Sequence, residues 1–259
     1  MNGAPLLVER DGPLGILTLN RPDKLNALNQ DLRQRIMDAL QELAVDPSVK
    51  VAIIHGRGDK AFVAGADVGE FASRTPAEQR AVYQNPRVYD VAAAFPKPLI
   101  AAIHGFCIGG GCELALACDV RVADRTARFS QAEIRLGLIP GAGGTQRLAR
   151  LVGAGQAMRI ALTGDSVEAE EALRIGLVEF LVDDGEHMEK ARDLAERMAR
   201  WSPVALRLVK QSIRAALETP LSAGLDLERE LFLSAFSSDD GREGVQAFIE
   251  KRKPEFKGS

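Results

Sequence analysis

Two glutamates, Glu113 and Glu133, stand beside turns rich in glycine or apolar residues. Glycine leaves backbone N–H groups unshielded by a Cβ atom, so a ligand oxygen can approach them closely. Carboxylates next to such donors supply an acid, a base and a cradle for a developing oxyanion, which are the groups needed to add or remove water beside a carbonyl. A further glycine-containing segment, residues 64–67, precedes both glutamates. We therefore predict that these segments form one active site.

A strand and a helix are predicted around Glu113. Residues 97–105 form a short apolar run bounded by proline and glycine, which indicates a buried strand. Three glycines at 109–111 then lead into residues 112–118, whose small apolar side chains favour a tightly packed helix. The N–H groups at a helix start attract an oxygen atom, and Gly110 is the donor we favour. The glycines fit equally well a turn that only lets strand and helix pack closely.

Glu133 follows a predicted pair of strands, residues 119–123 and 127–130, and precedes a stretch dense in glycine and proline. That stretch predicts a structured turn opening a helix near Thr145. It is not a phosphate loop, because the Lys-Ser/Thr ending is absent and the dinucleotide-binding spacing fails at Gln146. The sequence therefore excludes nucleoside triphosphate chemistry at this turn.

Five motifs, in order, resemble the enoyl-CoA hydratase/isomerase, or crotonase, superfamily. They are Asn-Arg-Pro with Leu-Asn-Ala-Leu in 20–28, Phe-Val-Ala-Gly-Ala-Asp at 62–67, Gly-Gly-Gly-Cys-Glu-Leu at 109–114, Pro-Gly-Ala-Gly-Gly-Thr-Gln-Arg-Leu at 140–148, and Phe-Lys-Gly at 256–258. Each is weak alone, but the ordered set is specific and spans nearly the whole chain. The resemblance implies an α/β fold, a crotonase-like spiral of ββα units with a C-terminal helical trimerisation region.

The resemblance also implies that the chain is divided into two regions with different functions. Residues 1–200 would form the spiral core with the CoA-thioester site, and residues 201–259 a helical region for oligomerisation and site closure. The backbone N–H groups of Ala66 and Gly110 would form an oxyanion hole for the thioester carbonyl, with Glu113 and Glu133 as the acid/base pair. The residues expected to contact substrate or CoA are Lys24, Leu25, Ala64, Ala66, Asp67, Val68, Gly110 and Gly141. No cofactor is expected, since coenzyme A is part of the substrate.

Possession of both glutamates favours hydration over double-bond migration. Family members that only shift a double bond generally keep a carboxylate matching Glu133 and often lack the one matching Glu113. An isomerase using Glu133 alone remains the alternative, with Glu113 merely favourable to the helix dipole. A second alternative is a silent member that binds acyl-CoA or RNA, although both carboxylates are retained and no Lys/Arg run is present.

The pair itself predicts a coupled titration. Two carboxyl groups that share one water cannot both ionise easily, because like charges raise one pKa. In hydration the ionised glutamate would draw a proton from water as its oxygen attacks Cβ of a trans-2-enoyl thioester. Which glutamate is the base stays open at this point, since the pair titrates as a unit.

Several positions depart from the family pattern without touching the acid/base pair. They are Gly69, where close hydratases often carry lysine, Ser130 and Ala132 beside the second glutamate, and His104, Phe106 and Cys107 before the glycines. Residues 70–95, which help shape the acyl pocket in this family, show no chemistry of their own. Short-chain, medium-chain, aromatic and alicyclic acyl groups therefore all stay open.

Composition fits a globular enzyme. The chain has 259 residues, of which 46% are hydrophobic and 27% charged, and a formal net charge of −3. No basic field exists to hold nucleic acid. No stretch approaches ~20 uninterrupted apolar residues and residues 1–10 do not form a leader, so we expect no membrane contact and a cytoplasmic location. The three cysteines and three histidines lack metal-ligand spacing, so we expect reduced packing cysteines and no metal.

The remaining elements alternate between strand and helix until residue 201. Strands are predicted at 6–10, 14–19, 51–55, 99–104, 119–123 and 179–182, and Asn29 is predicted to cap a helix with one apolar stripe. Beyond Trp201 only helices are expected, and their apolar side chains cover more than one helix face. That surface would be buried either in its own domain or between subunits, and the resemblance favours trimers that pair into hexamers.

Overall fold

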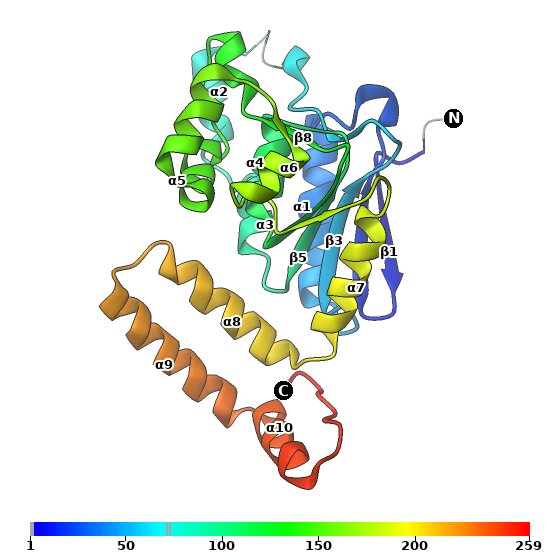
Figure 1. The fold of residues 1–259 in the computed structure, drawn as a ribbon, viewed down its shortest axis with the longest axis vertical. Coiled ribbons are helices and arrows are strands. Elements are labelled where there is room, and N and C mark those ends of the chain that lie inside the picture. Colours follow the sequence, from blue (N-terminus) through cyan, green and yellow to red (C-terminus); the bar gives the residue numbers. More distant parts are fainter. Residues whose placement is uncertain (1–2, 71, 73) are drawn as a thin grey trace.

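The computed structural model describes residues 3–70, 72 and 74–259. Residues 1 and 2, in the start that we expect to carry no leader, lie outside the described residues, as do residues 71 and 73 of the 70–95 segment. Strands and helices alternate through the first two thirds of the described chain, and helices alone follow (Figure 1).

A six-stranded sheet forms the centre of the molecule. Its strands, in spatial order, are β1 (Leu6–Asp11), β2 (Leu14–Leu19), β3 (Val51–Gly56), β5 (Leu99–Ile103), β7 (Val120–Asp124) and β10 (Phe180–Val182). Only the first pair, β1 and β2, is antiparallel. The central strands are buried on both faces, which explains why they are nearly continuous apolar runs that the sequence predicts well.

A second sheet of four short strands lies beside the first. It consists of β4 (Ala61–Val63), β6 (Phe106–Ile108), β8 (Arg128–Ser130) and β9 (Val167–Glu168), in that order. β3 leads into β4, β5 into β6 and β7 into β8, so three successive turns of the chain place one strand in each sheet before a helix follows. This connectivity confirms the α/β class and the spiral of ββα units.

The predicted pairing of strands 119–123 and 127–130 is wrong. Residues 120–124 belong to the large sheet as β7, whereas residues 128–130 belong to the small sheet as β8. The turn at 125–127 is tight enough to suggest a hairpin, yet it changes the direction of the chain between two sheets. Strands β4, β6 and β9 escaped prediction because two or three residues carry no readable alternation.

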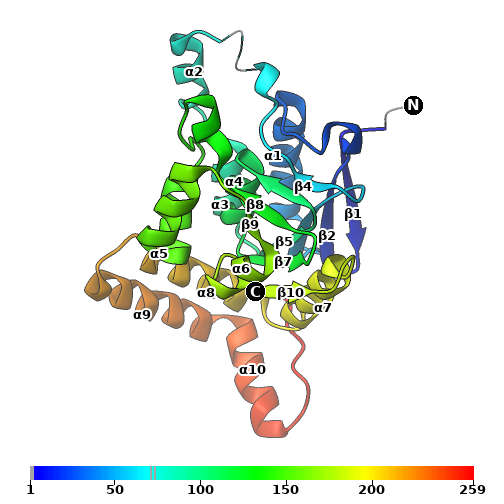
Figure 2. The same ribbon diagram turned by 45° about the horizontal axis from the view of Figure 1, so that its top comes forward.

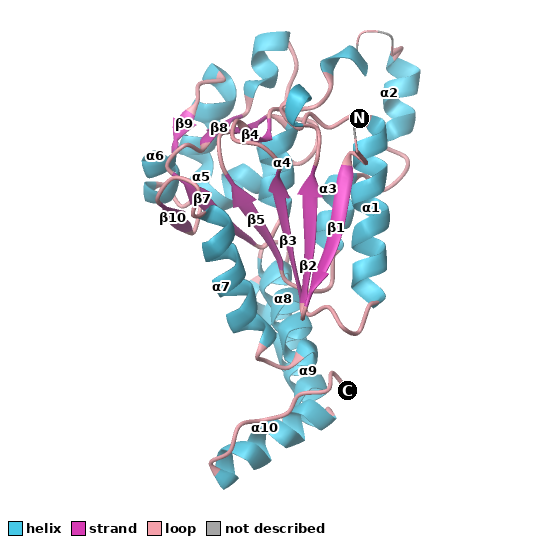
Figure 3. Cartoon of the chain, turned by 90° about the vertical axis from the view of Figure 1, so that its right-hand side faces the viewer, coloured by secondary structure: helices cyan, strands magenta, loops and turns pink. Residues whose placement is uncertain are grey.

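Helices cover both faces of the large sheet (Figure 3). Those that precede the C-terminal region are α1 (Gln30–Val45), α2 (Pro76–Val82), α3 (Val88–Ala94), α4 (Gly110–Ala117), α5 (Gly144–Thr163), α6 (Ala169–Arg174) and α7 (His187–Ala199). Three alanines of α7 pack on the strand side chains that face one way, and α1, α3 and α4 pack on those that face the other. The Asn29 cap of α1 is confirmed, since its side chain accepts a hydrogen bond from the Leu32 N–H at 2.9 Å.

Three helices extend away from the sheets: α8 (Pro203–Ala216), α9 (Leu221–Ser237) and α10 (Asp239–Glu250) (Figures 1 and 2). Neither α8 nor α9 contains a buried residue. Large apolar side chains therefore face outward, among them Val209, Ile213, Leu221, Phe232 and Phe236. Burial within their own domain is thus wrong for these residues, which the rest of the chain does not cover. The domain division at residue 200 stays a prediction.

Candidate active site

The site is assembled around the first turn of α4. Gly109 precedes that helix with φ 51° and ψ −119°, a backbone conformation that L side chains rarely adopt. A Cβ atom on Gly111 would lie 2.2 Å from the backbone oxygen of Val63. The packing role weighed for the glycines therefore occurs, because Gly111 allows α4 to pack against β4 and Gly109 makes the turn. The role of Gly110 as an oxygen-binding donor stays a prediction. The helix begins at Gly110, two residues before the predicted start.

Two free backbone donors lie side by side at this helix start. Leu28 donates its N–H to the Gly65 carbonyl at 2.9 Å and accepts from the Asp67 N–H at 3.1 Å, as in a parallel bridge. The N–H of Ala66 between them therefore points away from Leu28. A Cβ atom on Gly110 would lie 3.4 Å from that Ala66 nitrogen.

The N–H of Gly110 belongs to the first helical residue and has no acceptor within the helix. Among the described residues, neither this N–H nor that of Ala66 donates a hydrogen bond. The structure thus brings together the two donors that the sequence analysis selected, and leaves both able to bind an oxygen atom.

Glu113 is fixed in one position by the turn that follows the second glutamate. Its side chain is buried, and its Oε1 atom accepts hydrogen bonds from the N–H of Ala142 at 2.6 Å and of Gly144 at 2.9 Å. Burial raises the pKa of Glu113, whereas these two hydrogen bonds act to lower it. The sequence analysis recognised the turn but not its donors, because their partner lies about thirty residues away.

Glu133 lies in a short 3₁₀ helix, Ala132–Leu136, and points back toward Gly109. A Cβ atom on that glycine would lie 2.9 Å from the Glu133 Oε1 atom, and the Oε2 atom is buried without a hydrogen-bond partner among the described residues. Burial raises the pKa of Glu133 to about 7, and the charge of nearby Glu113 adds to the effect. The two carboxyl groups therefore differ: one is held by backbone donors, and the other is free and easily protonated.

The residues expected to hold CoA fall into two places. The turn around Lys24 and Leu25 meets the 64–68 segment, since the Ala64 N–H donates to the Leu25 carbonyl at 3.0 Å. Val68 is exposed at that edge. Gly141 lies apart from this pair of segments, and its carbonyl accepts a hydrogen bond of 2.5 Å from the Arg87 guanidinium.

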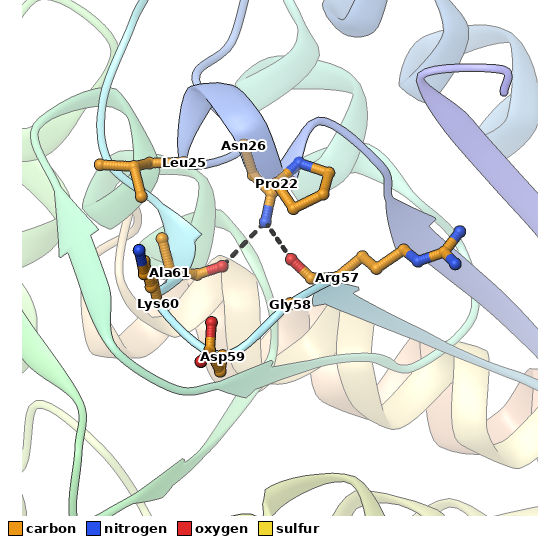
Figure 4. Close-up of a pocket in the computed structure, with 8 residues that line it drawn as sticks. All are labelled: Pro22, Leu25, Asn26, Arg57, Gly58, Asp59, Lys60 and Ala61. Carbon is orange, nitrogen blue, oxygen red and sulfur yellow. Dashed lines mark hydrogen bonds between the residues drawn. The ribbon is translucent and has the colours of Figure 1, made fainter. Parts of the chain in front are cut away.

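A cavity of about 150 Å³ lies beside Leu25 (Figure 4). It is lined by Pro22, Leu25, Asn26 and residues 57–61. Neither Glu113 nor Glu133 lines this cavity. Figure 4 shows the Asn26 side chain donating to the carbonyl oxygens of Arg57 and Ala61, at 3.0 and 2.8 Å. Asn26 thereby fixes the left-handed turn that presents Leu25, a positioning role that its motif alone did not reveal.

The cysteines, histidines and acidic residues are the candidate metal ligands of the described chain. No group of three or more His, Cys, Asp or Glu residues there could hold a metal ion. Cys107, Cys112 and Cys118 are buried and free, as expected of packing residues. The histidines, however, are less dispersed than their spacing suggests, because the rings of His104 and His187 stack with centroids 4.7 Å apart.

These features define a class of protein, a ββα spiral whose paired carboxyl groups flank free backbone donors. The family model for enoyl-CoA hydratase/isomerase matches residues 9–259, and the chain belongs to that family. A short-chain-enoyl-CoA hydratase of Clostridium acetobutylicum is 42% identical over 252 residues, which cover 96% of each chain. A 2,3-dehydroadipyl-CoA hydratase of Escherichia coli is 45% identical over 253 residues, covering 98% of each.

Solved structures agree with the fold. The crystal structure of an enoyl-CoA hydratase from Bacillus anthracis superposes with a TM-score of 0.93 at 38% identity, covering 98% of this chain and all of that one. Among the described residues, no helix is long and apolar enough to cross a membrane.

Proposed function

We propose that this protein is an enoyl-CoA hydratase, which reversibly adds water to a trans-2-enoyl-CoA to give a 3-hydroxyacyl-CoA in the degradation of fatty acids or related acyl groups. One observation carries the proposal: Glu113 and Glu133 converge on the start of α4, where the N–H groups of Ala66 and Gly110 are free. The curated relatives named as hydratases support it.

The difference between the two carboxyl groups suggests their roles. Backbone donors stabilise the ionised form of Glu113, which suits a base that draws a proton from water as the water oxygen attacks Cβ. Glu133, with a pKa near 7, is protonated readily and suits the acid that delivers a proton to Cα. The charge that develops on the thioester oxygen would be held by the N–H groups of Ala66 and Gly110, where loss of one such donor typically costs about 10²–10³ in rate.

CoA would be held along the edge formed by the 24–25 turn and the 64–68 segment. Backbone groups of Lys24, Leu25, Ala64 and Asp67 are brought together there by the hydrogen bond between Ala64 and Leu25. The substrate supplies the only coenzyme, and the steps above require neither a metal nor a redox cofactor. Gly141, bound to Arg87, would line the acyl end of the site.

Self-association as a trimer or a dimer of trimers is part of the proposal. Phe232 is 65% exposed and Phe236 63% exposed in the single chain, and their rings stack 6.1 Å apart. Exposed large apolar side chains are frequent on α8 and α9, and surfaces that gather such side chains often mark an interface. We also propose a cytoplasmic location, which rests only on the lack of a long apolar stretch in the sequence.

The decisive experiment separates hydration from double-bond migration. The purified protein is incubated in oxygen-18 water with crotonyl-CoA and, separately, with a trans-3-enoyl-CoA, and the products are analysed by mass spectrometry. A hydratase gives a 3-hydroxyacyl-CoA labelled at C3, whereas an isomerase using Glu133 alone moves a proton and introduces no oxygen.

Two results would contradict the proposal in different ways. Efficient migration without labelled hydroxy product from any 2-enoyl-CoA would favour the isomerase, in which Glu113 serves only the helix dipole. Tight binding of acyl-CoA without turnover of either substrate would favour a silent binding member. Medium-chain, aromatic and alicyclic enoyl-CoA esters complete the panel, because the sequence is compatible with each of these acyl groups.

A further inference from the structure

Tyr89 places a phenol hydroxyl at the two backbone donors. The residue lies in α3, is 6% exposed and belongs to the main hydrophobic core. Its Oη atom lies 2.9 Å from the point that a Cβ atom on Gly110 would occupy, and the Ala66 nitrogen lies 3.4 Å from the same point. The hydroxyl and the Ala66 nitrogen therefore both lie close to one point beside Gly110.

The Tyr89 hydroxyl has no partner among the described residues. Among the described residues it forms no hydrogen bond, although a buried tyrosine usually finds a partner for its O–H. Burial raises the pKa of Tyr89 well above its ordinary value, and the charges of Glu113 and Glu133 act in the same direction. The hydroxyl is thus kept protonated, as a donor whose acceptor is not among the described residues.

The ring is held so that the hydroxyl stays in place. Asp90 accepts hydrogen bonds from the backbone N–H and the Nε of Arg87, both at 3.1 Å, which fixes the first turn of α3. The Arg87 guanidinium lies 5.9 Å from the Tyr89 ring centroid and also binds the Gly141 carbonyl. A buried ring between α4 and this arginine has little freedom, unlike Tyr83, whose side chain is 51% exposed.

We propose that the Tyr89 hydroxyl donates a third hydrogen bond to the thioester oxygen, beside the N–H groups of Ala66 and Gly110. The oxygen gains negative charge as water adds to Cβ, so a fixed donor directed at that oxygen stabilises the transition state more than the ground state. The inference rests on the proposed function and refines it. Tyr89 would be a catalytic residue outside the five motifs that carry the family resemblance.

The test uses Tyr89→Phe, which deletes one oxygen and keeps the buried ring. With crotonyl-CoA we expect kcat to fall about tenfold to 10²-fold, toward the lower end reported for single oxyanion donors, while KM changes less than about threefold. Ser48→Ala also deletes one hydroxyl, in the exposed turn that follows α1, and should behave as the wild type. Equal kcat values for Tyr89→Phe and the wild type would overturn the inference.

A spectroscopic measurement separates carbonyl polarisation from packing. A bound 2,4-dienoyl-CoA absorbs at longer wavelength as donors polarise its carbonyl group, and the shift requires no turnover. We expect a smaller red shift in Tyr89→Phe than in the wild type and in Ser48→Ala. An unchanged red shift overturns the inference even if kcat falls, since the hydroxyl then acts through packing.

The inference can still be tested if the wild type is inactive or if the variant does not fold. If the wild type hydrates no enoyl-CoA, the proposed function fails, but the dienoyl-CoA spectrum still tests the hydroxyl. If Tyr89→Phe does not fold, fluorotyrosine is incorporated at position 89 in the Tyr83→Phe background. Fluorination strengthens the phenol as a donor while nearly keeping its shape, so the red shift should increase, and an unchanged or smaller shift would count against Tyr89.

Discussion

The raised pKa of Glu133 predicts that the stability of a variant without this carboxyl group rises, relative to the wild type, as the pH increases from 4 to 8. Burial and the charge of Glu113 raise this pKa from an ordinary value of 4.5 to about 7. A group whose pKa is raised by folding contributes stability below its unfolded pKa, and that contribution is lost as the pH rises through the folded value. A one-unit change in pKa corresponds to about 1.36 kcal/mol, so ionised Glu133 destabilises the fold by about 3 kcal/mol at pH 8.

Glu133→Gln removes the titration and keeps the shape of the side chain. The free energy of unfolding of the variant, minus that of the wild type, should therefore rise by about 3 kcal/mol between pH 4 and pH 8. The cost of burying the amide is the same at every pH and cancels in this comparison. Hydration should fall by at least about 10²–10⁴, since the amide cannot transfer a proton.

The assay is urea unfolding followed by circular dichroism at several pH values and one fixed subunit concentration, because self-association shifts apparent stability. Glu196→Gln serves as a matched control, since Glu196 is exposed on α7 and forms no hydrogen bond or ion pair among the described residues. A difference for Glu133→Gln that does not vary with pH would refute the reasoning from burial. Loss of activity without that pH-dependent gain would leave the catalytic role but remove its electrostatic explanation.

Two further predictions concern packing and the histidines. Gly111→Ala should lower the free energy of unfolding by about 3 kcal/mol and the melting temperature by roughly 6–12 °C, because the new Cβ atom meets the Val63 carbonyl. The control is Gly155→Ala in α5, where a Cβ atom meets no other atom and should cost no stability. Equal melting temperatures for the two variants would contradict this prediction. Burial, and to a lesser extent the charge of His187, lower the pKa of His55 to about 4 in the folded protein. As the pH falls, His55 therefore becomes protonated in the unfolded chain before it does so in the folded protein, which favours unfolding. His55→Gln should therefore lose about 2 kcal/mol less stability than the wild type between pH 7 and pH 5 in urea unfolding, and identical losses would refute the lowered pKa.

Local sequence determined the elements whose signals lie within a few residues. The apolar runs of β2, β3 and β5 carry their own burial pattern, and the Asn29 cap is readable because side chain and N–H are three residues apart. Both glutamates and the donors at Ala66 and Gly110 were selected from ordered motifs and from the family resemblance that these motifs carry, and their catalytic roles stay predictions. Gly110 was also favoured because the missing Cβ of glycine leaves its N–H open.

Only the tertiary structure decided how these residues differ. The hydrogen bonds from Ala142 and Gly144 to Glu113, and the unpartnered oxygen of Glu133, depend on a turn folding back onto α4 across the sequence. The outward apolar face of α8 and α9 is likewise a property of the assembled chain, since periodicity shows that a stripe exists but not what covers it.

Tyr89 shows the same limit most clearly. In the sequence it is one aromatic residue in a segment without recognisable chemistry, and nothing near it indicates a ligand. Folding packs α3 against α4 and brings its hydroxyl to the two free N–H groups, more than twenty residues away along the chain in each case. The sequence by itself therefore selected the candidate acid/base residues, whereas burial and long-range packing determined the direction of their pKa shifts and their neighbours.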